Sequence, residues 1–291
     1  MQKPDQKQKM IRGLQEFSLK NTDFKLSESE IIRQLEEKKG SLLYLGVFTK
    51  EEVIDTLYRF HILQELKTRG FTDIILDINT DDPHRHSLRI YFNEINKEHL
   101  LVEIILSEGV FKPRVQYLPS YKNNKYNMLM IEWLVLQNPL KQFLPEKTKL
   151  PGQQYPGLGM ARDVNKLLIS VAKYLKKDGI LNFPQYYHNA VIYSEFFKFY
   201  NPYMHGILKA LEHSLSRYPL DQVSNAMSMG CIKDLKDGTN FEWKAEELIL
   251  PLSSIMVSYF YSEEYENIVT NTMKKYDFDV DWGLYRSKIK I

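Results

Sequence analysis

Apolar residues recur along the chain with two different spacings, and these spacings predict a mixture of helices and strands. Residues 161–179 show the spacing of a helix with one apolar face and an opposite polar face. The apolar face comprises Val164, Leu167, Leu168, Val171, Ala172 and Leu175. Residues 49–70 predict another helix, because Thr49 can cap its first turn, acidic residues follow, and Gly70 can end it.

Five segments have the length and pattern of strands. They are residues 41–48, 71–79, 87–94, 99–109 and 126–139. The last of these, YNMLMIEWLVLQNP, is the longest apolar run in the chain, which is typical of a buried strand. We therefore expect residues 128–136 to form a central strand whose end lies beside the helix that starts near residue 160.

The chain beyond residue 200 predicts a different organisation, in which helices dominate. Residues 181–193, just before it, read as a strand or a loop. The expected helices cover residues 204–219, 220–228 and 253–276. Between the last two, residues 229–251 predict a hairpin around Asp237 and Gly238.

The order of these elements predicts an α+β fold, with a mixed and mostly antiparallel sheet flanked by helices and a helical C-terminal extension. The expected division is an N-terminal arm and helix in residues 1–40, an α+β domain in residues 41–200, and a mainly helical extension with a hairpin in residues 201–291. Within the first of these, Ser27 and Glu30 form a capping-box pattern.

Composition narrows the classes of function. The formal net charge is +2, from 39 basic and 37 acidic side chains, which gives no electrostatic argument for binding nucleic acid. Cys231 is the single cysteine, so an intramolecular disulfide and a zinc cluster of several cysteines are both excluded. The polar first residues lack a signal-peptide pattern, and no apolar run is long enough to span a membrane. These features predict a cytoplasmic protein.

A rigid, glycine-bearing turn occupies residues 150–160, LPGQQYPGLGM, directly before the helix of residues 161–179. Gly157 and Gly159 lack a Cβ atom and would let a phosphate approach the main chain, where the helix start offers free N–H groups. The turn matches neither the dinucleotide-binding fingerprint nor the P-loop. The alternative is an ordinary connection, because Pro-Gly and Gly-x-Gly are common turn sequences.

The turn and its surroundings resemble the GNAT superfamily of acyl-CoA N-acyltransferases. That family carries Gln/Arg-x-x-Gly-x-Gly/Ala between its fourth strand and the following helix, and residues 154–159, QYPGLG, match this pattern. Residues 189–199, NAVIYSEFFKF, are similar to the family's segment of alanine, tyrosine and phenylalanine near its last conserved helix. The resemblance covers about residues 41–200.

The resemblance implies a function and a set of ligand-binding residues. The main chain of this turn would bind the pyrophosphate of a coenzyme A thioester, acetyl-CoA or a longer acyl-CoA, whose pantetheine arm would run beside the fourth strand. The residues concerned are Gln154, Tyr155, Gly157, Leu158, Gly159, Met160 and Ala161. The acceptor would be a small-molecule or peptide amine, and self-association of the protein stays open.

Three side chains are candidates for proton transfer. Glu132 is an acid inside the most apolar strand, where burial would favour its neutral form and suit it to act as a base; alternatively, it points to solvent or meets a lysine. Tyr193 matches the tyrosine that often protonates the thiolate in the resembled family, although a packing role is the alternative. His188 lies among aromatic residues near the expected site and is a second choice for the base, the alternative being a packed histidine.

Other residues offer weaker signals. His84, His86 and His99 suggest a metal, but no further ligand stands at a recognised spacing, so no metal site is predicted. Asp163 lies in a first helical turn, where an acid is favoured without any role in function. The aromatic run of residues 183–203 could line an acceptor or acyl pocket, or form an ordinary core seam. A competing function follows from it: a non-catalytic α+β protein that binds a partner chain through this seam.

Overall fold

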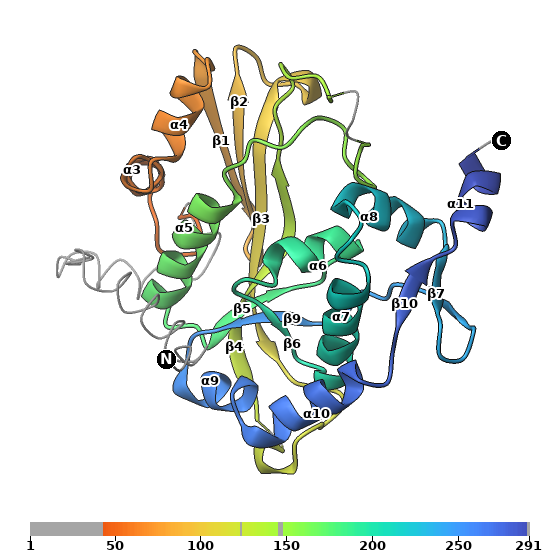
Figure 1. Ribbon diagram of the computed structural model, residues 1–291. Helices are drawn as coiled ribbons and strands as arrows, with labels where there is room; N and C mark the ends of the chain where they lie inside the picture. Colours follow the sequence, from red (N-terminus) through yellow and green to blue (C-terminus); the bar gives the residue numbers. More distant parts are fainter. Residues whose placement is uncertain (1–42, 123, 145–147, 290–291) are drawn as a thin grey trace, which may run out of the picture.

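A computed structural model describes residues 43–122, 124–144 and 148–289. Its centre is a seven-stranded sheet in the order β1-β2-β3-β4-β5-β9-β6, with helices packed around it (Figure 1). A smaller sheet has the order β10-β7-β8. The predicted α+β fold, with a mostly antiparallel mixed sheet and a helical C-terminal region, is therefore confirmed.

The strands are β1 (Ile74–Asp82), β2 (Arg85–Phe92), β3 (Leu100–Phe111), β4 (Tyr126–Leu136), β5 (Gly179–Asn182), β6 (Lys198–Phe199), β7 (Ile232–Asp234), β8 (Asn240–Phe241), β9 (Leu248–Pro251) and β10 (Phe278–Val280). The α-helices are α3 (Lys50–Arg59), α4 (Ile62–Thr68), α5 (Ala161–Tyr174), α6 (Tyr187–Tyr193), α7 (Pro202–Ser214), α8 (Leu220–Ser228), α9 (Ser254–Phe260), α10 (Glu263–Met273) and α11 (Trp282–Ile289). Short 3-10 helices cover Lys97–His99 and Pro119–Tyr121.

The sheet is antiparallel from β1 to β4, and β4 then pairs with β5 in parallel. β9 pairs antiparallel with both β5 and β6. β4 is thus the middle strand, as its apolar run predicts. The main-chain oxygen of Leu136, at the end of β4, accepts a hydrogen bond of 3.2 Å from the N–H of Leu158. The end of β4 therefore lies beside the turn that leads into α5, also as predicted.

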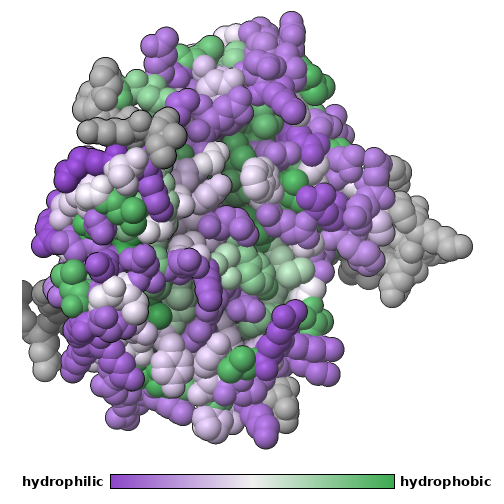
Figure 2. Space-filling view, turned by 90° about the vertical axis from the view of Figure 1, so that its right-hand side faces the viewer, coloured by the Kyte–Doolittle hydropathy of each residue, from purple (hydrophilic) through white to green (hydrophobic). Residues whose placement is uncertain are grey.

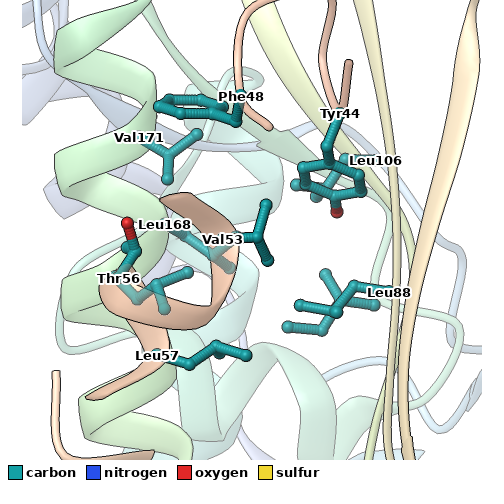
Figure 3. A pocket seen from close by; sticks show the side chains of 11 residues that line it. Tyr44, Phe48, Val53, Thr56, Leu57, Leu88, Leu106, Leu168 and Val171 are labelled. Carbon is teal, nitrogen blue, oxygen red and sulfur yellow. The ribbon is translucent and has the colours of Figure 1, made fainter. Parts of the chain in front are cut away.

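Two helices cover one face of the sheet around β2 and β3. The predicted cap of α3 is present: the Thr49 side chain accepts from the Glu52 N–H, and the Glu52 carboxylate accepts from the Thr49 N–H. Side chains from α3, α5, β2 and β3 converge on a small apolar cavity of about 30 Å³, whose lining includes Val53 and Val171 (Figure 3). The size of this cavity leaves room for about one methyl group or one water molecule.

The structure corrects two predictions near the start of the described chain. Within the expected strand 41–48, the described residues form a turn with one isolated bridge between Tyr44 and Phe48, because Leu45 and Gly46 have positive φ angles of 51° and 68°. The single helix expected over residues 49–70 is divided into α3 and α4. The break occurs at His61, whose φ angle of 59° is incompatible with a continuous right-handed helix.

The C-terminal region also differs from its prediction in places. The helix expected over residues 253–276 is divided into α9 and α10, and the Ser262 side chain caps the start of α10 by accepting from the Tyr265 N–H. The hairpin around Gly238 is present but contains only β7 and β8. Residues 248–251, which were expected in that hairpin, form β9 because all four are buried between β5 and β6.

β9 has a consequence for the predicted division of the chain. The boundary expected at residue 200 falls between β6 and β9, which are paired strands of one sheet.

The arm and helix expected in residues 1–40 lie outside the described residues. In residues 43–122, 124–144 and 148–289, none of the helices is long and apolar enough to span a membrane.

Candidate functional site

β4 and β5 are paired over only a short stretch. Their parallel pairing runs from Met128 with Gly179 to Ile131 with Asn182, where β5 ends, whereas β4 continues to Leu136. A β-bulge lies at this point, because Ile105 and Leu106 of β3 pair with residues 133 and 131 of β4, leaving residue 132 as the extra residue. A bulge bends its strand and increases the local twist, which accounts for β4 leaving its partner here.

The glycine turn returns to the same edge of β4 further along. The Asn138 N–H donates to the Pro156 oxygen at 2.7 Å, and the Leu158 N–H donates to the Leu136 oxygen. Gln137 and Gly157 form an antiparallel bridge between these bonds. Along this edge of β4, residues 128–131 pair with β5 and residues 136–138 bond to the turn. Residues 132–135 lie between these two paired stretches, and we call them the open edge of β4.

The open edge presents main-chain hydrogen-bonding groups. In an antiparallel pair, the N–H and C=O of one residue point to one side of the strand, and those of the next residue point to the other side. Gln137 donates to Leu101 on the β3 side, while Leu136 and Asn138 bond to the turn on the other side. By the same alternation, the N–H and C=O of Leu134 point away from β3, between the turn and β5. An extended ligand could pair with both groups.

The turn also leaves main-chain donors free. Gly159 has a φ angle of 70°, and a Cβ atom built there would meet nothing within 4 Å. A Cβ atom on Gly157 would meet only the Leu136 oxygen, at 3.8 Å. The N–H groups of residues 159–162 have no acceptor within the part of the chain that the structure describes. The amide of Leu158, in contrast, is already bonded to β4.

The side chains of the predicted ligand-binding segment divide into two groups. Leu158 and Met160 are almost fully buried and anchor the turn to the core. Gln154, Gly157 and Gly159 are exposed, so solvent reaches the main chain between the anchors. This alternation places free N–H groups at the surface of a firmly held turn.

Charged side chains surround the first turn of α5. Arg162 is 69% exposed and forms an ion pair of 3.6 Å with Glu195, which follows α6. Asp163 pairs with Lys166 at 3.2 Å. The ion pair with Glu195 shows that the C-terminal end of α6 approaches the start of α5, and Arg162 adds an exposed cation beside the free N–H groups.

Glu132 is the extra residue of the bulge, at the beginning of the open edge. Its side chain is 36% exposed and accepts a hydrogen bond from Arg85 Nε at 2.6 Å, forming an ion pair. The carboxylate is therefore not enclosed by the apolar strand, which corrects the premise on which its role as a base was predicted. His86 faces the side of the sheet that α3 and α5 cover, because its ring accepts a hydrogen bond from Leu45. Arg85 is the adjacent residue of β2, so its side chain points to the opposite face. Glu132 pairs with Arg85 and therefore projects to that face too.

Tyr193 is the last residue of α6 and is half-buried against Phe197, with ring centroids 5.3 Å apart. Burial raises the pKa of Tyr193 to about 12. The phenol is therefore protonated at neutral pH, which a proton donor requires. Its position at the end of α6 that approaches Arg162 keeps it a candidate for that role.

His188 is buried between α6 and α8. Its Nδ1 atom lies 2.7 Å from Ser224 Oγ, and its ring stacks on Tyr186 with centroids 5.5 Å apart. Burial lowers the pKa of His188 to about 4. These contacts account for the side chain as a packed, hydrogen-bonded histidine. Among the described residues, no contact joins His188, Tyr193 and Glu132 to one another.

Of the three histidines considered for a metal, two have side-chain hydrogen-bond partners. His86 accepts a hydrogen bond from the Leu45 N–H, and His99 lies 2.7 Å from the Asn96 side-chain oxygen. Across residues 43–122, 124–144 and 148–289, no group of three or more His, Cys, Asp or Glu side chains could hold a metal ion. Cys231 is a free, buried thiol.

The aromatic run of residues 183–203 is mainly a core seam. Tyr187, Phe197, Phe199 and Tyr200 are buried. Phe183, Tyr186 and Tyr203 are exposed at its two ends. Most of the run is therefore packed in the core, although Tyr186 and Tyr187 also line a surface cleft.

Sequence reasoning did not anticipate several parts of the site. Arg85, the partner of Glu132, is 47 residues away in the chain, and no local pattern links the two. The bulge and the free main-chain groups of Leu134 depend on strand register, which side-chain types do not specify here. Arg162 could have been identified from the sequence. A cation in the first turn of a helix interacts unfavourably with the helix dipole, so its presence there suggests another role.

Comparison of the chain with family models, with curated proteins and with solved structures gives no match. The relationship to the GNAT superfamily therefore stays a prediction from the sequence. A function must be argued from the open edge of β4, the free N–H groups of the turn and the side chains around them.

Proposed function

We propose that the protein is an acyl-CoA-dependent N-acyltransferase, which moves an acyl group from a coenzyme A thioester to an amine. One observation carries the proposal: the open edge of β4 ends at a glycine turn whose free N–H groups begin a helix. A thioester of coenzyme A has two matching parts, an extended arm with amide groups and a pyrophosphate. The arrangement supports binding of both parts side by side.

The pyrophosphate would bind at residues 159–162. Four consecutive N–H groups there lack an acceptor among the described residues, and the positive end of the α5 dipole favours an anion, typically by about 0.3–1 kcal/mol at exposed sites. The exposed guanidinium of Arg162 would exchange Glu195 for a phosphate oxygen. Gly157 and Gly159 keep the approach to the main chain free of side chains.

The arm of the thioester would lie along the open edge. The N–H and C=O of Leu134 would pair with an amide of the arm, as a strand pairs with a sheet edge. The thioester carbon would then lie near the bulge, where β4 leaves β5. Glu132 stands at this point on the opposite face from α5, so an amine acceptor would approach from that face.

The reaction would be direct transfer. The amine nitrogen attacks the thioester carbonyl carbon, the C–S bond breaks, and the amine loses one proton while the thiolate gains one. Glu132, released from Arg85, would accept the amine proton directly or through one water, and Tyr193 would protonate the thiolate. His188 is a less suitable base, because a pKa of about 4 is far from the operating pH.

The glycines of the turn provide the test. Gly157→Val adds a side chain at a position with room for it, so the fold should be retained while the phosphate is blocked. Gly159→Val should also block binding, but its positive φ angle adds strain. Gly238→Val is the matched control, since Gly238 has a φ angle of 76° and open space in the β7–β8 hairpin.

Thermal unfolding with coenzyme A is the measurement. A ligand at one hundred times its dissociation constant stabilises a protein by about 2.7 kcal/mol. We expect this stabilisation in the wild type and in Gly238→Val, and its loss in Gly157→Val and Gly159→Val. Equal stabilisation of all four proteins would contradict the phosphate site.

A second function remains if coenzyme A does not stabilise the wild type. The exposed ends of the aromatic run, Phe183 at 45% and Tyr203 at 48%, would then favour a non-catalytic protein that binds a partner chain there. Location in the cytoplasm is part of the main proposal. The near balance of charge supports an acceptor other than nucleic acid.

A further inference from the structure

A cleft of about 630 Å³ lies between the start of α6, the end of α8, the segment after β8, and α11. Small-molecule sites typically measure about 300–1,000 Å³, so this cleft has room for a ligand. It lies on the side of the molecule where α8, β7, β10 and α11 are placed in Figure 1. Figure 2 shows that side, with mainly hydrophilic side chains and a gathering of hydrophobic ones towards its centre.

One wall of the cleft is aromatic and firmly held. Trp243 donates from Nε1 to the Pro184 oxygen at 3.0 Å, and its ring meets Tyr187 edge to face at 5.6 Å. Tyr186 also lines the cleft, with its ring fixed by stacking on His188. Met227 adds an adaptable thioether beside them. Such a wall binds apolar bodies, and its ring faces attract cations.

The cleft contains a carboxylate that can pair with a cation. Glu242 lines it, is exposed, and forms no ion pair within the described residues. The C-terminal end of α8 also faces it and contributes partial negative charge from its last carbonyl groups. Lys288 is a cation in the same lining; its Nζ atom donates to the Met229 oxygen at 2.5 Å and forms no ion pair with Glu242.

We propose that this cleft binds an organic ammonium ion, with its apolar body against Tyr186, Tyr187 and Trp243 and its charged end at Glu242. The aromatic faces, the unpaired carboxylate and the helix end all attract the same kind of ligand. This proposal does not rest on acyl transfer. The cleft does adjoin the start of the glycine turn, since a Cβ atom on Gly152 would lie 2.8 Å from the Tyr186 ring.

The test is calorimetric titration of the full chain with three probes of similar shape: 2-phenylethylamine, 3-phenylpropan-1-ol and 3-phenylpropanoate. We expect the amine to bind, the neutral alcohol to bind more weakly, and the carboxylate to bind most weakly. Glu242→Gln keeps the shape of an exposed side chain and should weaken amine binding by about 5-fold while leaving alcohol binding unchanged. Glu98→Gln, at an exposed position in the Lys97–His99 helix, is the control and should change nothing.

Three results would overturn the proposal. They are absence of amine binding by the wild type, binding of 3-phenylpropanoate at least as tight as that of the amine, and equal amine affinity of wild type and Glu242→Gln. Binding of coenzyme A is measured separately with the glycine variants. Failure of one proposal can therefore be told apart from failure of the other.

Discussion

Lowering the pH should destabilise the protein through His188, and the size of this effect follows from its burial. The side chain is 6% exposed, and burial lowers its pKa from 6.5 to about 4. The folded state therefore binds a proton less readily than the unfolded state. The stabilisation is complete above the unfolded pKa of 6.5 and is lost as the pH falls from there to about 4.

The magnitude comes from the difference between the two pKa values. The fall in the His188 pKa from 6.5 to about 4 corresponds to a loss of about 3 kcal/mol in the free energy of unfolding at about pH 4. His205 is fully buried beside Tyr265, and burial also lowers its pKa, as it does that of His86. The wild type will therefore lose more than this amount, and a variant is needed to isolate His188.

His188→Asn removes the titrating ring and keeps a group that can bond to Ser224. Urea unfolding of both proteins, followed by circular dichroism, gives the free energy of unfolding at about pH 7.5 and about pH 4. The variant should be less stable at the higher pH because of lost packing. On acidification, the wild type should lose about 3 kcal/mol more than the variant. A difference between the two proteins that does not change with pH would refute the reasoning.

Two further predictions concern the proposed reaction and the core. Glu132→Gln should lower the rate of acyl transfer by about 100-fold or more. Tyr193→Phe should lower this rate less if water can replace the phenol as proton donor. A rate assay that finds both variants at wild-type turnover would remove these residues from the mechanism. Val171→Ile adds one methylene at the small cavity under α3 and α5 and should raise the free energy of unfolding by about 0.5 kcal/mol; urea unfolding that shows a loss would mean that the cavity cannot take the added atom.

Local signals predicted the elements that local chemistry determines. The apolar run of β4 and the apolar face of α5 have the right period, and the cap at Thr49 has both of its partners in the sequence. The predicted end of the helix at residue 179 is wrong, because α5 ends at Tyr174 and Gly179 begins β5. The break at His61 could not be predicted this way, because it lies inside a segment with a continuous helical pattern. The break after Tyr261 does have a local signal, because Ser262 caps α10 and acidic residues follow it.

The place of β9 in the main sheet could not be predicted from local sequence signals either. Its residues, LILP, follow the hairpin in the chain and fit a hairpin strand by pattern. They enter the main sheet instead, because β5 leaves an unpaired edge that four buried residues can fill. No local signal specifies a partner strand about 70 residues earlier in the chain.

The candidate site divides in a similar way. The glycine turn and its helix could be found from the sequence, because glycine positions and a helix start are local features. The exposure of Glu132 could not be found from the sequence, because apolar residues precede and follow it in the chain. The bulge that contains Glu132 depends on the pairing of β4 with β3. His188 forms a hydrogen bond with Ser224 of α8, and its aromatic neighbours in the sequence do not reveal this contact.

Amide chemical shifts measured by NMR on addition of coenzyme A test the central claim most directly. The main-chain N–H groups of residues 159–162 and of Leu134 should shift together as the ligand binds, because the phosphates and the arm of the thioester would meet these groups. The amide of Leu158, already bonded to Leu136, should shift less. Binding that leaves residues 159–162 and Leu134 unchanged, or no binding at all, would contradict the account.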